Sequence, residues 1–211
     1  MTRKLQLAVK RCFDILVSLL VLVPFLPVWA VIALLIKVTS PGPVFFLQDR
    51  PGKDARIFKV YKFRTMRPGS EKMVKGVEVM RDDDRVTSIG RFLRRSKLDE
   101  IPQCLNVLKG EMSLIGPRPE RVASLEDYDE EISKRLRMLP GMTGLAQVSG
   151  NIYLDLQQRY QLDVYYVEHY SLWLDIRILA RTVGVVLLGE EHYLGKPLVS
   201  IPAQGEAREE A

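Results

Sequence analysis

Residues 15–36, ILVSLLVLVPFLPVWAVIALLI, form an uncharged apolar run near the start of the chain. The run is as long as the roughly 20 apolar residues that a helix needs to cross the hydrocarbon core of a bilayer. A cleaved signal peptide would have a shorter apolar run followed by a small-residue cleavage motif, and the sequence has neither feature. We therefore expect a segment that is embedded in a membrane.

Pro24 and Pro27 lie in the middle of this run. Each proline removes one backbone hydrogen bond, which costs about 3 kcal/mol in a helix interior, and their spacing places both bends on one side of the helix. A break here predicts two arms of about 15 Å, each half of a hydrocarbon core about 30 Å thick. Such a segment could enter the bilayer and return as a re-entrant hairpin, whereas an ordinary proline-kinked helix would cross it.

Basic residues flank the apolar run on both sides, and positive charge marks the cytoplasmic side of a membrane segment. They are Arg3, Lys4, Lys10 and Arg11 before the run, and Lys37, Arg50, Lys53, Arg56, Lys59 and Lys62 after it. Two positive flanks favour the hairpin, with both ends cytoplasmic. The residues alone leave the hairpin and the kinked spanning helix equally open.

The composition fits one compact domain attached to this membrane segment. The chain has 211 residues, of which 47% are hydrophobic, and a net charge of +5, which indicates an anionic partner: nucleic acid, a membrane surface or a phosphate-bearing substrate. Cys12 and Cys104 lie far apart and support neither a disulfide framework nor a zinc site, so a reducing compartment fits best. Neither His169 nor His192 belongs to a catalytic motif.

The remaining sequence predicts strands first and helices later. Residues 40–66, rich in β-branched and aromatic side chains around the turn RPGKD, predict a β-hairpin. Residues 67–85 predict an irregular excursion, in which the acidic residues 82–84 could bind magnesium, although a solvated turn is favoured. Residues 125–139, LEDYDEEISKRLRML, predict an exposed charged helix.

Residues 156–188 are amphipathic, with an apolar stripe opposite Arg177 and Arg181 and several aromatic residues upstream. This pattern suits a helix in the headgroup layer of a membrane, and a helix packed on the core would give the same stripe. The stripe consists of Leu172, Ile176, Leu179, Val183 and Leu187.

These observations predict a membrane-associated α+β protein with an N-terminal membrane helix that is broken at its prolines, for which a re-entrant and a spanning path both stay open. A cytoplasmic globular domain with a β-hairpin and several interfacial amphipathic helices would follow it. The predicted boundaries are residues 1–39 for the membrane segment and its basic flank, 40–189 for the globular domain, and 190–211 for a flexible C-terminal tail rich in charge.

Two adjacent carboxylates, Asp99 and Glu100, directly follow a basic run in RRSKLDEIPQ, residues 94–103. Pro102 is tolerated only in the first turn of a helix, so we expect a helix that begins close to Asp99 and ends at Gly110. Consecutive helical residues point about 100° apart, so the two acids cannot act as a symmetric pair and should have different roles.

A carboxylate nucleophile has to be ionised. A helix N-terminus and the neighbouring cations Arg94, Arg95 and Lys97 are expected to lower the pKa of Asp99 and to attract a diphosphate. A divalent cation could bridge the two like charges. The alternative is that Asp99 only caps the helix, which is the commoner outcome for such a local pattern.

Arg118 stands between two prolines in SLIGPRPE, residues 113–120. Prolines on both sides restrict the backbone and position the guanidinium in advance, which suits bidentate capture of a phosphate group. A rigid surface turn without a ligand is the alternative.

At these residues the sequence resembles a known family. The segment RVTSIGRFLRRSKLDEIPQCLNVLKGEMSLIGPRPE, residues 85–120, together with the membrane run, VYKFRTM and LPGMTGLAQVSG, is similar to the bacterial sugar transferases, the monotopic polyprenol-phosphate phosphoglycosyl transferases. The resemblance covers roughly residues 8–188, with several separated motifs in the same order. The chain resembles the minimal form of that family.

The resemblance implies a two-step transfer at the cytoplasmic face of the bacterial inner membrane, by a monotopic enzyme with a re-entrant hairpin. The aspartate of the Asp-Glu dyad attacks the sugar-bearing phosphate of a UDP-sugar, and UMP leaves. Polyprenol (undecaprenyl) phosphate then attacks the phosphosugar-enzyme intermediate, with the help of Mg²⁺, and this step begins the assembly of a membrane glycoconjugate.

Residue by residue, the resemblance makes Asp99 the nucleophile and Glu100 its partner, and both are candidate magnesium ligands. Arg118 matches the phosphate-binding arginine. Weaker candidates for substrate binding are Arg94, Lys62, Arg64 and Gln147. Pro24 and Pro27 match the break in the membrane helix.

Three positions depart from the family pattern. Leu26 precedes Pro27 where relatives often have serine, Lys97 stands where small polar residues are common, and Asn151 replaces a frequent arginine. The sequence does not identify the sugar or the glycan, and it leaves a homodimer open. Two other classes of protein fit parts of the sequence: a non-catalytic anchor that binds anionic lipids, and a nucleic-acid-binding protein, for which no motif is found.

Overall fold

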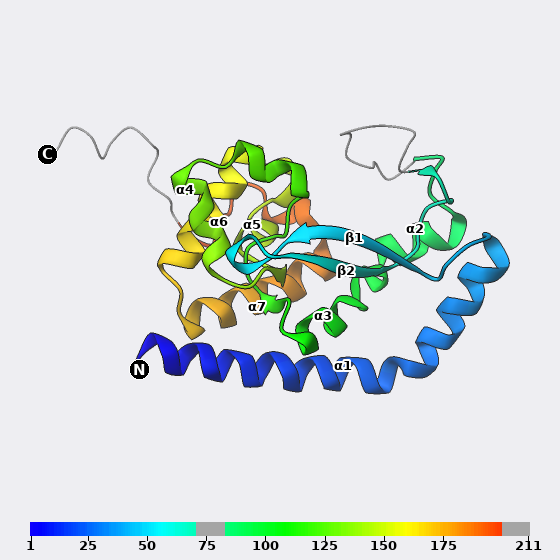
Figure 1. Ribbon diagram of the computed structural model, residues 1–211, viewed down its shortest axis with the longest axis horizontal. Helices are drawn as coiled ribbons and strands as arrows, with labels where there is room; N and C mark the ends of the chain where they lie inside the picture. Colours follow the sequence, from blue (N-terminus) through cyan, green and yellow to red (C-terminus); the bar gives the residue numbers. More distant parts are fainter. Residues whose placement is uncertain (71–82, 200–211) are drawn as a thin grey trace, which may run out of the picture.

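The computed structural model describes residues 1–70 and 83–199 and combines helices with two small β-sheets (Figure 1). The predicted mixture of helix and strand is therefore confirmed. The helices and strands are α1 (Arg3–Thr39), β1 (Phe45–Pro51), β2 (Ile57–Phe63), α2 (Ser88–Arg95), α3 (Gln103–Lys109), β3 (Ser113–Ile115), α4 (Glu130–Ser133), β4 (Gly141–Thr143), α5 (Leu145–Val148), α6 (Leu156–Glu168) and α7 (Leu172–Leu188). The 3-10 turns are η1 (Lys53–Ala55), η3 (Leu98–Glu100), η4 (Val122–Asp127), η5 (Lys134–Arg137), η6 (Asn151–Tyr153) and η7 (Glu190–Tyr193).

Helix α1 continues through Pro24 and Pro27 and is bent, where the sequence predicted a broken helix. Figure 1 shows a long straight segment along one side of the molecule, followed by a turn toward the hairpin. The physical reason is that a missing proline N–H disturbs the hydrogen-bond ladder only locally, so the helix kinks and resumes. By length and composition α1 could cross a membrane, and most of its surface is not covered by protein.

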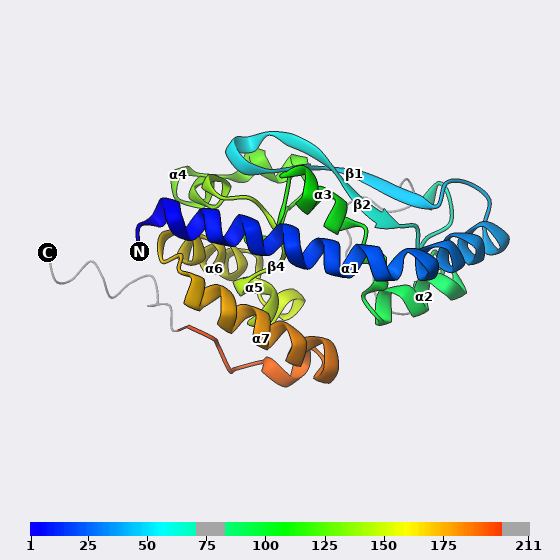
Figure 2. The same ribbon diagram turned by 90° about the horizontal axis from the view of Figure 1, so that it is seen from below.

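Two parts of α1 pack on the rest of the chain. In the first part the buried residues recur every fourth position and face α3, β3 and α7; they are Lys10, Asp14, Ser18 and Leu22. In the second part Ile32 and Ile36 are buried against the hairpin and α2, together with Phe63 and Leu93. Figure 2 shows α1 passing between the hairpin side and the α6–α7 side of the molecule.

The predicted β-hairpin is confirmed. Strands β1 and β2 are antiparallel, and their register pairs Phe45 with Phe63 and Pro51 with Ile57. Asp54 in the turn has a positive φ of 55°. At the open end of the hairpin, where β2 ends, the Phe63 ring stacks on the Phe45 ring with 5.4 Å between the ring centroids.

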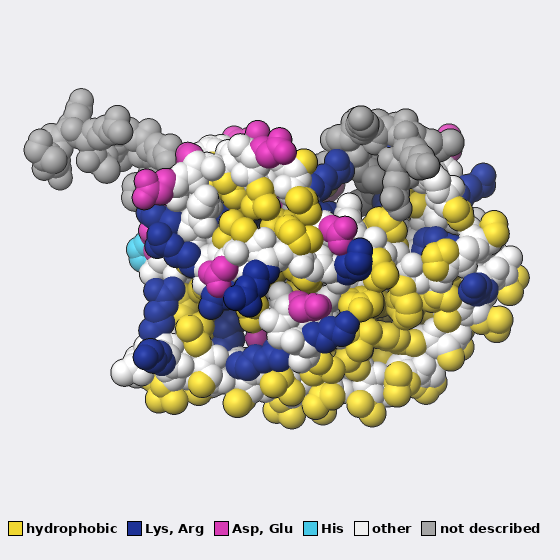
Figure 3. All heavy atoms as spheres, viewed as in Figure 1, with side chains coloured by type: hydrophobic (Ala, Val, Ile, Leu, Met, Phe, Trp, Pro, Cys, Tyr) yellow, Lys and Arg dark blue, Asp and Glu magenta, His cyan; other side chains and the backbone are white. Residues whose placement is uncertain are grey.

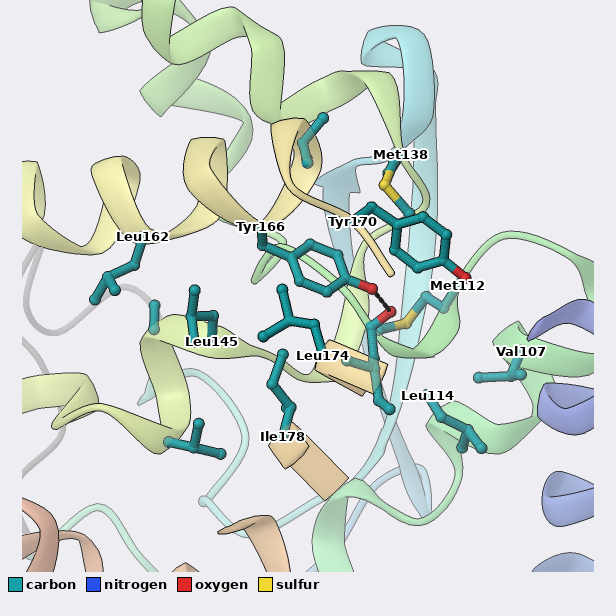
Figure 4. Close-up of a cluster of buried hydrophobic side chains, with 14 of the residues drawn as sticks. Val107, Met112, Leu114, Met138, Leu145, Leu162, Tyr166, Tyr170, Leu174 and Ile178 are labelled. Atoms are coloured by element: carbon teal, nitrogen blue, oxygen red, sulfur yellow. Dashed lines mark hydrogen bonds between the residues drawn. The ribbon is translucent and has the colours of Figure 1, made fainter. Parts of the chain in front are cut away.

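The main hydrophobic core lies among β3, β4, α5, α6 and α7, with Tyr166 at its centre (Figure 4). Strands β3 and β4 form a parallel pair in which Ser113 lies opposite Gly141. A Cβ atom on Gly141 would lie 2.1 Å from the backbone nitrogen of Gly116, so only glycine allows this approach. The two glycine-containing motifs therefore pack backbone against backbone.

The amphipathic stretch is two helices, α6 and α7, separated at Tyr170 and Ser171, where the Ser171 side chain caps α7. Leu174 and Ile178 supply the core contacts of α7. In the predicted stripe, Ile176 is 57% exposed and Leu187 is 76% exposed. A core role for the whole stripe is thus wrong, and an interfacial role stays a prediction.

Residues 125–139 do not form the predicted exposed helix. They divide into the end of η4, the short helix α4 and the turn η5, and Ile132 and Arg135 are buried. The charge of Arg135 does not keep it exposed, because Asp163, much later in the chain, pairs with it in the interior.

Residues 190–199 lie in the predicted C-terminal tail, whose flexibility stays a prediction. They include η7, in which the Tyr193 ring lies under the Arg181 guanidinium at 4.3 Å. The same tyrosine packs on Gly184, where a Cβ atom would meet its hydroxyl at 2.0 Å. The tail prediction for residues 200–211, like most of the predicted excursion, lies outside the described residues.

Candidate active site

The acidic pair lies in the 3-10 turn η3, between α2 and α3. Lys97, just before it, has a left-handed backbone with φ of 57°, which ends the α2 segment and redirects the chain. Helix α3 begins at Gln103, so the prediction that a helix begins close to Asp99 is wrong by one turn. Pro102 stands at the N-cap of α3, where its missing N–H has no cost.

Asp99 is buried, with 9% of its surface exposed, and its Oδ1 atom has no hydrogen-bond partner among the described residues. Burial and the nearby Glu100 raise the pKa of Asp99 to about 6, against the opposing effect of Lys62, Arg94 and Lys97. The expectation of a lowered pKa is wrong because burial outweighs the cations. At neutral pH the carboxylate is still mostly ionised.

Glu100 has the opposite character. Its Oε1 atom accepts a hydrogen bond from Lys62 Nζ at 2.7 Å. Burial acts to raise the pKa of Glu100, but Lys62 and Arg118 outweigh burial and lower it to about 2. The pKa values of the two adjacent acids therefore differ widely. Such a difference is expected where two carboxylates have different tasks.

A polar pocket lies beside Glu100, between the hairpin and the loop after β3. Its lining includes Arg50, Lys62, Glu100, Gln103, Arg118 and Pro119. Figure 3 shows basic and acidic side chains close together on the face of the molecule that carries the hairpin. The pocket thus brings together Lys62, Glu100 and Arg118, three of the residues that the sequence selected.

Arg50 is a pocket residue that sequence reasoning treated only as part of the basic flank. Its Nη1 donates to the Pro119 carbonyl at 3.1 Å. Burial, and then the nearby Arg118, lower the pKa of Arg50 to about 10. The only signal in the sequence was its position on the predicted hairpin, and it takes the strand register to show that this strand faces the loop of Arg118.

The other predicted substrate-binding residues take different positions. Arg94 Nε donates to Thr65 Oγ1 at 2.9 Å, and this arginine is near enough to Asp99 to affect its pKa. Arg64 is buried and donates to the Ser40 carbonyl at 2.7 Å, where it closes the C-terminal end of α1. Gln147 is buried in α5, and its two amide atoms have no partner among the described residues. Substrate roles for these residues stay predictions.

Two departures from the family pattern meet at one carboxylate. Glu190 Oε1 accepts from Asn151 Nδ2 at 3.0 Å and lies 3.3 Å from Lys97 Nζ. The turn that holds Asp99 is therefore connected to η7. Nothing in the sequence pointed to this contact, because 93 residues separate Lys97 from Glu190.

The donor set for a magnesium ion is small. The structure describes no group of three or more acidic, histidine or cysteine side chains that could hold a metal within residues 1–70 and 83–199. Asp83 pairs with Arg85, and Asp82 lies outside the described residues. The unpartnered oxygen of Asp99, together with Glu100, fits the one or two carboxylates with which proteins hold Mg²⁺ against a substrate's phosphates.

Comparison with known proteins bears on this site. Residues 5–189 match the family described as bacterial sugar transferase. The chain belongs to the bacterial sugar transferase family. The match includes most of α1, the acidic turn, the pocket and the loop of Arg118.

Relatives of this bacterial sugar transferase carry names that describe transfer to undecaprenyl phosphate. It is 43% identical over 188 residues to the UDP-N-acetylgalactosamine-undecaprenyl-phosphate N-acetylgalactosaminephosphotransferase of Aeromonas hydrophila, covering 86% of this chain and 44% of that protein. It is 42% identical to the UDP-glucose:undecaprenyl-phosphate glucose-1-phosphate transferase of Escherichia coli (strain K12), covering 82% of this chain and 39% of that protein.

A third relative is similar in length. The exopolysaccharide production protein PSS of Rhizobium leguminosarum bv. phaseoli is 42% identical over 190 residues, covering 85% of this chain and 95% of that protein. By contrast, this bacterial sugar transferase spans less than half the length of the first two relatives.

Proposed function

We propose that this protein is a phosphoglycosyl transferase that moves a phosphosugar from a UDP-sugar to polyprenol phosphate. The observation that carries the proposal is the state of Asp99: its carboxylate is buried, has one unpartnered oxygen and lies near three cations. The names of the relatives, which state UDP-sugars and undecaprenyl phosphate, support the same substrate class here.

The first step is attack of an Asp99 oxygen on the sugar-bearing phosphorus of the UDP-sugar. A bond forms between that oxygen and phosphorus, and the bond from phosphorus to the bridging oxygen breaks, so that UMP leaves with the electron pair. In the second step a phosphate oxygen of polyprenol phosphate attacks the same phosphorus. The Asp99 carboxylate is released, and polyprenol-diphosphate-sugar is formed.

The cations of the pocket have separate tasks in this scheme. Arg118 and Arg50 line the pocket and would bind the diphosphate, and Lys62 holds Glu100 in its ionised form. When bound by Asp99 and Glu100, Mg²⁺ would neutralise negative charge on the phosphates. Arg94, beside Asp99, would offset the charge that remains on the carboxylate.

The contacts of α1 support a monotopic arrangement, with both ends of the helix on one side of the membrane. Near its start, Arg3 donates to the Val167 carbonyl at 2.8 Å, and Lys10 pairs with Asp175. At its other end, Arg64 and Phe63 hold the last turn. Because the same domain binds both ends, the bend would enter the bilayer and return, at the inner membrane with the site facing the cytoplasm.

Covalent labelling tests the proposal. The purified protein is incubated with a panel of UDP-sugars labelled in the sugar, with magnesium and without lipid, and UMP and protein-bound label are measured. We expect UMP release and label on Asp99 with at least one sugar, and neither from Asp99→Asn. Asp83→Asn, which changes a carboxylate outside the pair, is the matched control and should be labelled normally. Full transfer by Asp99→Asn would contradict the mechanism.

The rival function is a non-catalytic anchor that binds anionic lipids through its basic surface. It predicts that no UDP-sugar in the panel releases UMP. It also predicts that Asp99→Asn changes nothing measurable, so the same experiment separates the two functions.

A further inference from the structure

The backbone of Arg118 is held by a buried ion pair that lies outside the pocket. Arg135, in η5, and Asp163, in α6, form a salt bridge in which the two side chains are 2% and 1% exposed. Their partner Arg118 lies in the loop after β3, so three separate parts of the chain meet here.

The backbone of Arg118 lies against this pair. Arg135 Nη2 donates to the Arg118 carbonyl at 2.7 Å and to the Asp163 carboxylate. The Arg118 N–H faces that carboxylate closely enough to lower its pKa, although Asp163 Oδ1 has no hydrogen bond of ordinary geometry. Burial is the larger effect and raises the pKa of Asp163 to about 6.

The guanidinium of Arg135 is itself held in one orientation. Its Nη1 donates to the Tyr128 hydroxyl, and the Tyr160 ring lies 4.6 Å from its central carbon. The two tyrosine rings contact each other edge to face at 5.3 Å. A planar guanidinium with fixed partners presents its N–H groups in fixed directions, which a lysine could not do.

Stability alone does not explain this arrangement. A buried ion pair contributes little compared with apolar residues of the same volume, because both charges lose their hydration. Arg118 also needs external support: Pro117 and Pro119 restrict local torsions but have no N–H with which to attach the loop. The carbonyls of the two prolines accept from Gly141 N–H and from Arg50, and the ion pair adds a hydrogen bond to the carbonyl of Arg118 itself.

We propose that Arg135 and Asp163 are positioning residues that aim the Arg118 guanidinium at the diphosphate of the UDP-sugar. This inference rests on the function proposed above. Neither residue lines the pocket beside Glu100, and their effect passes through the backbone of Arg118. Arg135 lines a neighbouring hollow together with Arg118 and Pro119. A fixed backbone removes the need to order Arg118 when the substrate binds.

The structure supplies a matched control. Lys10 and Asp175 form a second buried ion pair, with side chains 7% and 9% exposed, and Asp175 also accepts from the Tyr166 hydroxyl at 2.7 Å. This pair joins α1 to α7 and has no contact with Arg118 in the described part of the chain. Asp163→Asn and Asp175→Asn therefore remove the same charge from two similar surroundings.

The experiment measures UMP release by the full chain in detergent or nanodiscs, with varied UDP-sugar and saturating polyprenol phosphate. We expect Asp163→Asn to lower kcat/KM for the UDP-sugar by about 10- to 100-fold, mainly through KM, with the KM for polyprenol phosphate unchanged. Asp175→Asn should lower the melting temperature but leave the KM for the UDP-sugar within about threefold of the unchanged protein.

A double-mutant cycle tests the route through Arg118. In an Arg118→Ala background the guanidinium is absent, so Asp163→Asn should have almost no further effect on kcat/KM. Full labelling of Asp99 at high UDP-sugar would show that Asp163→Asn is folded. If that variant does not fold, Arg135→Lys is used, which keeps the charge but cannot supply the same fork of donors.

Three results would overturn the inference. The first is an unchanged KM for the UDP-sugar in both Asp163→Asn and Arg135→Lys, and the second is a rise in that KM from Asp175→Asn equal to the rise from Asp163→Asn. The third is an undiminished effect of Asp163→Asn on kcat/KM in the Arg118→Ala background. Failure of the proposed function looks different. In that case the unchanged protein itself releases no UMP from any UDP-sugar.

Discussion

Asp99 shows how burial and charge compete at a single side chain. Burial, with Glu100 adjacent, raises its pKa to about 6 although three cations act in the opposite direction. In its ionised form an unpartnered buried oxygen is a strong nucleophile, because little hydration has to be removed before attack. The same features make the ionised carboxylate a cost to the fold.

The pH dependence of the proposed first step follows from this pKa. The rate of UMP release at low UDP-sugar should fall as the pH decreases through about 6, because protonated Asp99 cannot attack phosphorus. Lys62→Met should move the fall to higher pH, since Lys62 lowers the pKa of Asp99. UMP release between about pH 5 and pH 8 measures both effects. A rate that stays constant down to pH 5 would contradict the assignment.

The stability of an Asp99→Asn variant gives an independent check. The folded chain holds the Asp99 proton more tightly than the unfolded chain, so ionisation above about pH 6 costs the fold on the order of 2 kcal/mol. Removing the charge should raise the melting temperature by about 5 °C near pH 7 and leave it nearly unchanged near pH 4. Scanning calorimetry of the variant and the unchanged protein at both pH values measures this difference. A lower melting temperature of Asp99→Asn at neutral pH would contradict the burial of an ionised group.

At this scale the sequence identified the pair but not its surroundings. The adjacent acids, the basic run and the Pro-Arg-Pro motif are local patterns, and they were visible. The pKa of Asp99 was predicted in the wrong direction because burial depends on the loop packing around η3. Arg50, Arg135 and Asp163 were missed because their roles depend on contacts with residues far along the chain.

Among the elements, the β-hairpin and residues 125–139 contrast in how well the sequence predicted them. Alternating strand residues around a turn specify a hairpin locally, and β1 and β2 formed as predicted. Residues 125–139 were predicted as an exposed helix, since their charges read as solvated. Asp163, the partner that allows Arg135 to be buried, is too far along the chain for a local sequence pattern to reveal it.

The bend in α1 predicts that removing its prolines destabilises the protein, although proline removal usually stabilises a helix. Replacing Pro24 and Pro27 with alanine stabilises an isolated helix by up to about 3 kcal/mol at each position. Here we expect the double variant to be less stable, because a straight helix of 37 residues would be about 55 Å long and could not hold both the Lys10–Asp175 pair and the Arg64 contact.

The melting temperature and the rate of proteolysis in nanodiscs measure this outcome. Leu26→Ala, which changes an exposed α1 residue between the prolines without altering the backbone, is the control. A double variant with a higher melting temperature and full activity would show that the bend is not required.

For the whole molecule, the two attached ends of α1 predict where the N-terminus lies. A cysteine introduced as Thr2→Cys should react with a membrane-impermeant thiol reagent only after the cells are opened. The background must carry Cys12→Ala, because Cys12 is exposed, whereas Cys104 is buried. Lys53→Cys in the turn of the β-hairpin is the control for the side of the membrane on which we propose that the globular domain lies. Labelling of residue 2 in intact cells would refute the re-entrant path of α1.

The exposed apolar surface extends beyond α1. Figure 3 shows apolar side chains along the edge of the molecule where α1 runs, and α7 adds Trp173, Ile176 and Leu187. The two helices lie close together through the Lys10–Asp175 pair. We therefore expect both to contact the same membrane surface, with α7 in the headgroup layer.

Tryptophan fluorescence can test the position of α7. The chain has two tryptophans, and Trp29→Phe leaves only Trp173, which is 67% exposed. In vesicles that contain brominated lipids, the fluorescence of Trp173 should be quenched, because bromine on the acyl chains would lie within contact of the ring, and a soluble quencher should have little effect.

The matched control moves the fluorophore to a surface that should not meet the membrane. In a Trp29→Phe, Trp173→Phe background, Ile57→Trp places the ring at the end of the hairpin, where residue 57 is half exposed. This variant should respond to the soluble quencher and not to the brominated lipid. Equal responses from residues 57 and 173 would mean that α7 faces water, and the membrane surface would then be formed by α1 alone.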